Sequence, residues 1–333
     1  MSAGSLLDVL PDHNLEALWA PREQSIGAEP FARETAIHWP WNVVQPIADR
    51  AGDEVSMQDA ERRVLLLANP SSKFATVGTL NAAVQVLNPG DIAEPHRHSI
   101  AALRLITDYD GGITTVDGVQ CPMAAGDLIL TPAWCWHGHF NDTNRRLMWV
   151  DVLDAALVAG WDAVFFEHPG AQTPKLADAV PFCDLAWSGA GIVQADLKPV
   201  TSYSPKLRYA WTETKPALDA GSPLADASRE VRYVNPLNGR PVLPTLDCYA
   251  VRLERGCATR PKRSTASMVC YVIEGEGHSC VGDRTFNWSR NDVFTVPHWQ
   301  WVSHTAEGGA AYIAQVTNKG MLETLGILRE ELT

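Results

Sequence analysis

The sequence predicts an all-β protein made of two β-barrels in tandem, preceded by an N-terminal arm with a short helix. The sequence contains an internal duplication: VLNPGDIAEPHRHS, which begins at Val86, corresponds to RLERGCATRPKRST, which begins at Arg252. Within each copy, short runs rich in Val, Ile, Leu and Tyr alternate with Gly, Asp and Asn, which is typical of antiparallel strands and turns. A chain of 333 residues with 46% hydrophobic side chains can bury two cores.

The duplication defines the boundaries that we expect. Residues 1–63 form the N-terminal arm, which is rich in Trp and Pro up to about residue 55 and packs on the domain or on a neighbouring subunit. Its run after Ser56, MQDAERRVLLLA, begins with an N-cap signature and predicts a short helix. The first barrel spans 64–180 and the second 236–333. The connection over 181–235 ends in KPALDAGSPLADASREVRYVNP, whose Pro, Ala, Ser and Gly predict a linker or irregular structure.

Composition excludes several classes of protein. The chain has no run of eighteen apolar residues, and its N-terminus lacks a basic region followed by an apolar core, so we expect no membrane association. Seven dispersed cysteines, never spaced as CxxC, indicate reduced thiols and a cytoplasmic protein. A net charge of −12 without a basic block argues against a nucleic-acid partner.

The histidines of PHRHS are the first candidates for chemistry. His96 and His98 are two residues apart, so on a strand both side chains point to one face, which in a barrel is the inside. Buried imidazoles need partners for their nitrogens, and a metal ion provides one. His137, in TPAWCWHGHFN, can complete a set of three ligands. Alone, the HxH pair also fits an exposed strand without any metal.

The spacing of these residues resembles a known family. Gly90 with His96 and His98, then Gly126 with Pro132, His137 and Asn141, resemble the two cupin motifs. More closely, LNPGDIAEPHRHSIAALRLI, GDLILTPAWCWHGHFND, WVDVLD and ERRVLLLANP resemble the gentisate 1,2-dioxygenase family of bicupin ring-cleaving enzymes, which includes salicylate, substituted-salicylate and 1-hydroxy-2-naphthoate dioxygenases. The resemblance runs from about His38 to the end of the chain and is densest over residues 60–155. It implies two double-stranded β-helix (jelly-roll) barrels, Fe(II) in the first, and often a homotetramer.

The second copy lacks the metal-binding pattern. The positions that match His96, His98 and His137 hold Lys262, Ser264 and Val302, so the C-terminal cupin is degenerate and we expect it to be structural. His304 matches His139 and, without neighbouring ligands, is expected to be an ordinary polar residue.

The first copy also lacks a carboxylate ligand. Many cupins have a glutamate four or five residues after the second histidine, but here Ala102 and Leu103 are followed by Arg104. Three neutral imidazoles leave a ferrous ion its double charge and three open positions, which suits a 2-hydroxybenzoate that chelates as an anion and O2 beside it. Arg104 matches the family's arginine and is expected to pair bidentately with the substrate carboxylate or to stabilise developing charge. The alternative is a surface arginine.

Further site residues are suggested by pattern and by resemblance. His139 is a candidate acid/base outside the ligand set, or a hydrogen-bonded core histidine. Gln85 would share an inward face with Asn81 and needs a polar partner, such as the substrate. Either Arg62 or Arg63 matches a family arginine that contacts the substrate carboxylate. Asp151 matches a family aspartate near the ring, or has a pairing role.

One departure from the family concerns the choice of substrate. Before the glutamine the family has LWAG or LYAG, whereas this chain has LNAA, with Asn81 in place of the aromatic residue. We expect Asn81 to open the pocket and to offer a hydrogen bond near the ring. This favours gentisate or a 5-substituted salicylate.

The predicted reaction opens the ring between the carboxylate-bearing and hydroxyl-bearing carbons and incorporates both atoms of O2; gentisate would yield maleylpyruvate. Two other classes stay open at this point. One is a cupin isomerase or hydrolase that uses zinc or manganese without O2. The other is a non-enzymatic, ligand-binding bicupin.

Overall fold

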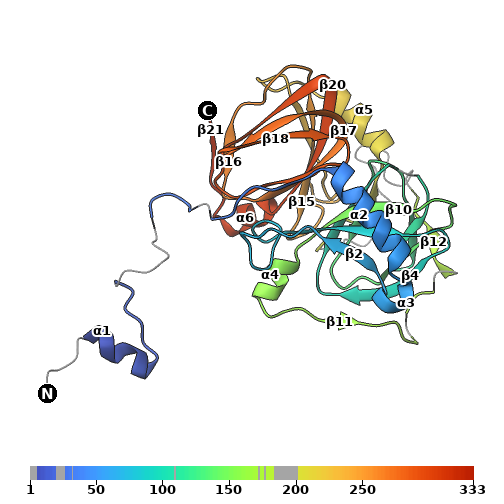
Figure 1. Ribbon diagram of the computed structural model, residues 1–333, viewed down its shortest axis with the longest axis horizontal. Coiled ribbons are helices and arrows are strands. Elements are labelled where there is room, and N and C mark those ends of the chain that lie inside the picture. Colours follow the sequence, from blue (N-terminus) through green and yellow to red (C-terminus); the bar gives the residue numbers. More distant parts are fainter. Residues whose placement is uncertain are drawn as a thin grey trace. The chain divides into compact units, whose positions relative to one another are not determined.

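The computed structural model describes residues 6–19, 27–31, 33–108, 110–171, 173–175, 178–183 and 202–333 (Figure 1). The chain divides into two units, Met1–Phe31 and Ala32–Thr333. In the first unit, helix α1 (Leu6–Val9) continues into a 3-10 helix, η1 (Leu10–His13). The second unit contains both barrels. No helix in these ranges is both long and apolar enough to cross a membrane.

Two six-stranded sheets form the first barrel in the described residues. All neighbouring strands are antiparallel except β7 and β12. The first sheet has the order β13 (Arg208–Tyr209), β8 (Leu128–Thr131), β5 (Ala102–Ile106), β10 (Leu147–Leu153), β3 (Asn81–Leu87) and β2 (Arg63–Leu66). The second has the order β11 (Phe166–Glu167), β4 (Ile92–His98), β9 (His137–Phe140), β6 (Ile113–Val116), β7 (Val119–Pro122) and β12 (Val180–Pro181).

Alternation along the strands separates two cores. On β5, Leu103 and Leu105 pack into a cluster that also contains Tyr271 and Val316 of the second barrel. Side chains between them point the other way, into the first barrel, because successive residues of a strand face opposite sides. Arg104 therefore faces the barrel interior, where a second cluster includes Ile106.

The second barrel is a nine-stranded sheet in the described residues. Its first strand, β1 (His38–Trp39), lies in the predicted arm and pairs with β19, which places this part of the arm in the second barrel. The other strands are β14 (Arg229–Arg232), β15 (Asp247–Leu253), β16 (Lys262–Ser264), β17 (Met268–Val281), β18 (Arg284–Ser289), β19 (Val293–Val296), β20 (Val302–Thr317) and β21 (Glu330–Leu332). With the first barrel, they confirm the predicted tandem jelly-roll fold.

Several local predictions are wrong. The helix after Ser56, α3, covers only Met57–Ala60, and the following RVLL is strand β2, because it pairs with β3. The predicted linker contains α5 (Trp211–Ala220), whose Trp211 and Leu218 are buried, and β14, an edge strand of the second barrel. Pro216 lies inside α5, so burial of an apolar face outweighs the proline that suggests a break. Two further helices follow the last long strand of each barrel, α4 (Ala155–Gly160) after β10 and α6 (Lys319–Leu325) after β20.

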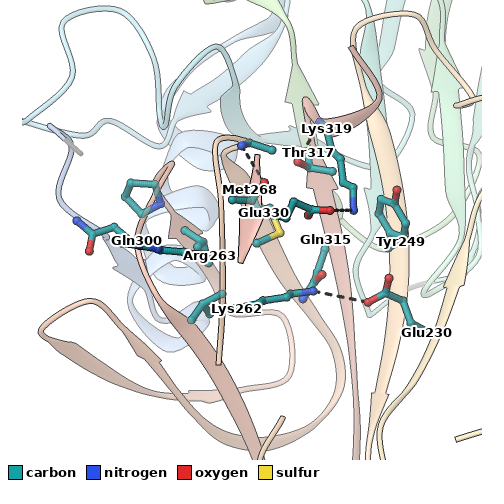
Figure 2. Close-up of a pocket in the computed structure, with 15 residues that line it drawn as sticks. Glu230, Tyr249, Lys262, Arg263, Met268, Gln300, Gln315, Thr317, Lys319 and Glu330 are labelled. Carbon is teal, nitrogen blue, oxygen red and sulfur yellow. Dashed lines mark hydrogen bonds and ion pairs between the residues drawn. The ribbon is translucent and has the colours of Figure 1, made fainter. Parts of the chain in front are cut away.

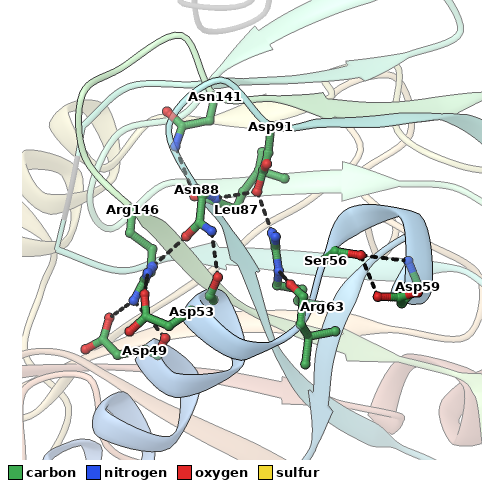
Figure 3. A network of polar contacts seen from close by, with 12 residues as sticks. Asp49, Asp53, Ser56, Asp59, Arg63, Leu87, Asn88, Asp91, Asn141 and Arg146 are labelled. Atoms are coloured by element: carbon green, nitrogen blue, oxygen red, sulfur yellow. Dashed lines mark hydrogen bonds and ion pairs between the residues drawn. The ribbon is translucent and has the colours of Figure 1, made fainter.

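The arm also contains a long helix that the sequence analysis missed, α2 (Trp41–Glu54). Arg146 holds it to the first barrel: its Nη1 lies 2.8 Å from Oδ1 of Asp49, and its Nε donates to Oδ1 of Asn88 at 2.6 Å (Figure 3). Asn88 in turn donates to the carbonyl of Gly52 at 2.7 Å. A side chain at Gly52 would meet Arg146, since an added Cβ would lie 2.6 Å from its Nε.

Inside the second barrel, a satisfied polar network replaces the metal-binding pattern. His304 Nδ1 lies 2.7 Å from Oγ of Ser279, and Nε2 lies 3.3 Å from Nε2 of Gln315. Trp288 also donates to Ser279, at 2.8 Å. In the pocket of Figure 2, Lys262 occupies the position that matches His96, and its Nζ lies 3.7 Å from Oε2 of Glu230. The prediction that His304 is an ordinary polar residue agrees with these contacts.

His304 gives the protein a testable pH dependence. Burial lowers its pKa to about 3, whereas an unfolded chain protonates it near 6.5. Because the unfolded state then binds the extra proton, stability falls as the pH drops below 6.5. Relative to His304→Gln, the wild type should lose about 1.4 kcal/mol of unfolding free energy between about pH 5.5 and about pH 4.5. Urea unfolding of both proteins measures this; parallel pH profiles would contradict it.

Candidate metal centre and substrate site

Three histidines converge inside the first barrel. His96 and His98 lie on β4, and His137 on the neighbouring strand β9, directly opposite His96 in the register. One nitrogen from each ring can serve as a ligand, and the three lie within 4.8 Å of one another. The predicted ligands thus form one cluster, and among the described residues this cluster includes no carboxylate.

Their environment suits them to bind a metal. Nδ1 of His98 lies 2.7 Å from the carbonyl of Ile100, and Nδ1 of His137 lies 2.9 Å from that of Cys135. A carbonyl only accepts, so Nδ1 carries the proton and Nε2 keeps its lone pair for a metal. Burial lowers the pKa of all three rings, that of His96 to about 2, so they stay neutral at physiological pH. The donor set fits a divalent transition metal.

Arg104 lies beside this cluster, fully enclosed on β5. Its Nε is 2.9 Å from Oδ1 of Asp151, and its Nη1 donates to Oγ1 of Thr114 at 3.1 Å and to Nδ1 of His139 at 3.3 Å. Its guanidinium carbon is 5.0 Å from the ring centroid of Trp149. Protein groups therefore contact two of its three nitrogens, Nε and Nη1. The bidentate contact with a substrate carboxylate that the sequence suggested would have to break one of these protein contacts. Nη2 is the nitrogen left to face a ligand.

Asp151 forms an ion pair with Arg104 and fixes the orientation of its guanidinium. It is the direct register partner of Arg104, and its second oxygen accepts from Nε1 of Trp149 at 2.9 Å. Burial raises the pKa of its carboxyl, while Arg104 opposes that shift. Both carboxylate oxygens are thus turned to protein groups, which corresponds to the pairing role that the sequence left open.

His139 is buried two residues beyond His137 on the same face of β9. Arg104 can only donate, so Nδ1 of His139 accepts and its proton sits on Nε2. Burial holds the pKa of His139 well below its usual value, and the positive charge of Arg104 lowers it further. The ring is therefore a neutral hydrogen-bond donor at Nε2, and not a group that is protonated at physiological pH.

Of the two candidate arginines, Arg62 lines a cavity and Arg63 does not. Arg63 is engaged in structure: its Nε donates to the carbonyl of Val55 and its Nη1 to Oδ2 of Asp91, both at 2.5 Å (Figure 3). Arg62 donates from Nη2 to the carbonyl of Glu94 at 2.5 Å and lines a cavity of about 270 Å³ with His96 and Phe166. Burial lowers its pKa to about 10, and nearby Arg104 acts in the same direction.

Gln85 points into the barrel from β3 and is almost fully buried. Its Nε2 is one of several buried polar atoms that have no hydrogen-bond partner in the described part of the chain. Such atoms are rare in proteins and gather where a ligand binds. At and beside the histidine cluster they are Arg62 Nε, Gln85 Nε2 and His96 Nδ1, together with Arg104 Nε and Asp151 Oδ1, whose 2.9 Å contact is an ion pair without hydrogen-bond geometry.

Asn81 does not offer the free hydrogen-bonding group that the sequence suggested. Its Nδ2 donates to the carbonyl of Phe74 at 2.8 Å, and its Oδ1 accepts from the backbone N–H of Ala156 at 2.8 Å. Both ends of the amide are therefore engaged by backbone. Asn81 instead joins the start of β3 to the loop before it and to helix α4.

Sequence reasoning missed several side chains at the site. Phe166, on the two-residue strand β11, stacks on His96 with ring centroids 4.8 Å apart at 18°. Thr114 and Trp149 hold the ring of His139 and the guanidinium of Arg104. Thr114 is recognised from the strand register, in which it lies directly opposite His139 on β6. Phe166 follows a helix in an irregular stretch and matches no motif.

The histidine cluster predicts one metal site per chain. Metal-free protein should bind one equivalent of Co²⁺ with a d–d absorption band, because three neutral imidazoles converge there. His98→Ala and His137→Ala should each weaken binding by more than about 100-fold, since even partners of ligands matter 10–100-fold. His304→Ala, the matched histidine of the second barrel, should leave binding unchanged. Equal loss in all three variants would show that the metal binds elsewhere.

Comparison with known proteins agrees with this architecture. The family model described as "Cupin domain" matches residues 83–153, which contain the histidine cluster and Arg104. A salicylate 1,2-dioxygenase of Pseudoaminobacter salicylatoxidans, solved as an adduct with gentisate, superposes with a TM-score of 0.90 at 30% identity, covering 98% of this chain and 92% of that one.

Curated relatives match nearly the whole length. A gentisate 1,2-dioxygenase of Aquipseudomonas alcaligenes is 33% identical over 96% of this chain and 94% of its own. A 5-aminosalicylate 1,2-dioxygenase of a Comamonas species is 35% identical over 96% of this chain and 87% of its own. The chain belongs to the gentisate 1,2-dioxygenase family of bicupin ring-cleaving dioxygenases.

Proposed function

We propose that the protein uses ferrous iron, held by His96, His98 and His137, to open a 2-hydroxybenzoate between its carboxylate-bearing and hydroxyl-bearing carbons, incorporating both atoms of O2. The observation that carries this proposal is a cluster of three neutral imidazoles without a carboxylate, beside the buried Arg104 and the half-buried Arg62. Such a site is cationic once loaded with metal, and burial makes unpaired charge costly. A chelating aromatic anion would neutralise it.

Arg62 and Arg104 would bind and orient the substrate. Arg62 faces the cavity beside His96, and its unpartnered Nε is available to a carboxylate. Arg104 would add a single donor, Nη2, because Asp151, Thr114 and His139 hold its other nitrogens in a fixed orientation. A rigid guanidinium of this kind loses little freedom on binding.

Iron bound by the three histidines would supply O2 activation and coordination sites for the carboxylate and hydroxyl oxygens. The protein's own groups would supply position and hydrogen bonds. His139 would donate from Nε2 to an oxygen that gains negative charge, and Arg104 keeps it neutral for that task. Gln85 would donate its unpartnered Nε2 to the same ligand from β3.

Gentisate or a 5-substituted salicylate is our proposed substrate. Two of the relatives described above are a gentisate and a 5-aminosalicylate dioxygenase, and the ring of each named compound has a polar group at position 5. The third is named for salicylate, which has no such group, but was solved as an adduct with gentisate. Asn81 would favour a substituted ring only by leaving more space in the pocket than an aromatic residue would. It would not donate a hydrogen bond to the ring, because its amide is engaged by Phe74 and Ala156.

We further propose a homotetramer in the cytoplasm. The family resemblance supports the assembly, and the dispersed free cysteines support a reducing compartment. The zinc- or manganese-dependent isomerase or hydrolase and the non-enzymatic bicupin are not favoured, because full-length relatives are ring-cleaving dioxygenases.

An oxygen-electrode screen tests the function. Iron-loaded protein is given gentisate, salicylate and the 5-amino, 5-nitro and 5-chloro salicylates, with His137→Ala as the inactive control. We expect one O2 consumed per gentisate, with a ring-opened product. No uptake with any compound would overturn the proposed reaction. Turnover of salicylate far faster than every 5-substituted compound would overturn the substrate choice.

Arg62 should matter for substrate affinity. Replacing it with methionine keeps most of the volume and removes a charged hydrogen bond, which should raise KM by about 10-fold to 100-fold. Arg50→Met is the matched control, because Arg50 is an exposed arginine paired with Glu54 on α2. Steady-state kinetics measure both variants. An unchanged KM in Arg62→Met would remove Arg62 from the substrate site.

A further inference from the structure

Between the two metal-binding histidines of β4, Arg97 lies in a cage of aromatic rings. Its guanidinium carbon is 4.4 Å from the ring centroid of Trp134 and 4.8 Å from that of Trp136. Its Nη2 and Nε donate to Oε2 of Glu167 at 2.7 and 2.9 Å. We call these four residues the clamp. Cation–π contacts of this kind favour Arg, whose planar charge stacks on both rings.

The second barrel repeats the clamp residue for residue. Arg263 lies 4.3 Å from the ring centroid of Trp299 and 4.9 Å from that of Trp301. Its Nε donates to Oε2 of Glu331 at 2.7 Å. The second barrel has lost all three metal-binding histidines, yet it keeps this contact. The clamp therefore has a task that does not depend on the metal.

The backbone of the two tryptophans is repeated as well. Trp134 has φ of 63° and Trp299 has φ of 60°, a left-handed conformation that bulky residues rarely adopt. The N–H of Trp134 donates to the carbonyl of His98 at 2.8 Å, and that of Trp299 to Ser264 at 2.5 Å. Such strain persists only where surrounding contacts hold it.

In both barrels the clamp joins a short strand to the edge of the sheet. Glu167 is the register partner of Arg97 on β11, and Glu331 that of Arg263 on β21. A strand of two residues, such as β11, makes too few backbone hydrogen bonds to stay paired alone. Side-chain contacts must supply the rest, and the clamp provides them.

The residue next to the clamp glutamate differs between the two short strands, β11 in the first barrel and β21 in the second. Phe166 pairs with His98 in the register and stacks on the ring of His96, and it lines the same cavity as Arg62. Phe166 is still 46% exposed, so its place against the histidines depends on the pairing of β11 and on the preceding residue, Phe165. Phe165 exchanges hydrogen bonds with Ser99, and its ring lies 4.6 Å from that of Trp134, a member of the clamp. Ser264, which matches His98, is instead paired with Glu330 in the second barrel.

We propose that Arg97, held by Trp134, Trp136 and Glu167, is a positioning residue that keeps Phe166 over the metal-binding histidines. Phe166 forms an apolar wall for the ring of an aromatic acid and shields the bound metal from solvent. The part that concerns the aromatic acid rests on the proposed function. The part that concerns the metal does not.

The test compares matched variants in the full-length protein. Arg97→Met removes the charge and keeps the volume, Arg263→Met makes the same change in the second barrel, and Phe166→Ala removes the wall. The fourth protein is the double variant Arg97→Met/Phe166→Ala. KM and kcat for gentisate are measured, with Tm as the stability control. Release of Fe²⁺ from each loaded protein to the chelator ferrozine is a readout that needs no turnover.

We expect Phe166→Ala and Arg97→Met to raise KM by about twofold to tenfold with a smaller change in kcat, the range of one aromatic contact. Both should release Fe²⁺ faster. The double variant should match Phe166→Ala alone, because Arg97 acts through Phe166. Arg263→Met should lower Tm but leave KM and Fe²⁺ release unchanged.

Two results would overturn the proposal. One is an Arg97→Met protein that loses Tm but keeps the KM and Fe²⁺ release of the wild type, which would make the clamp purely structural. The other is a double variant whose effects simply add. A wild type that consumes no O2 with any 2-hydroxybenzoate would refute the proposed function instead, and Fe²⁺ release would still decide whether Arg97 holds Phe166.

Discussion

The charge of the buried metal site is the constraint on which the rest of the first barrel depends. Three imidazoles are kept neutral by burial, two guanidiniums lie beside them, and the cluster brings no carboxylate of its own. Adding a divalent cation makes this interior strongly positive, which a protein does not tolerate without a partner. Asp151 offsets part of the charge through Arg104, and the remaining demand suits an anionic, chelating ligand.

The duplicated barrel shows what happens when that constraint is removed. The second copy keeps the fold, the left-handed tryptophan and the clamp, but Lys262, Ser264 and Val302 stand in place of the ligands. His304 survives because Ser279 and Gln315 satisfy both of its nitrogens. Features common to both barrels thus maintain the architecture, including the pairing of a short edge strand, and the residues that serve the chemistry, such as Phe166 on that strand in the first barrel, are confined to the first.

The tandem barrels and the histidine cluster could be predicted from the sequence, because alternation along strands and motif spacing are local signals. The choice between Arg62 and Arg63 could not, since it depends on which side chain Asp91 holds. The prediction that Asn81 offers a hydrogen bond to the substrate was wrong, because the backbone groups of Phe74 and Ala156 that engage its amide come close to it only in the folded protein. Helices α2 and α5 contain prolines, and burial of their apolar faces outweighs that local signal. Phe166 is recruited by a strand of two residues that no periodicity reveals.

The central claim is that the substrate supplies the negative charge that the metal site lacks. Anaerobic titration of the iron-loaded and iron-free protein with gentisate and with its neutral methyl ester measures this directly, by calorimetry. The account predicts that gentisate binds the iron-loaded protein, and that either removing iron or esterifying the carboxylate weakens binding by at least about 100-fold, a loss of two charge-assisted contacts. Equal affinity for acid and ester, or binding that is indifferent to iron, would contradict it.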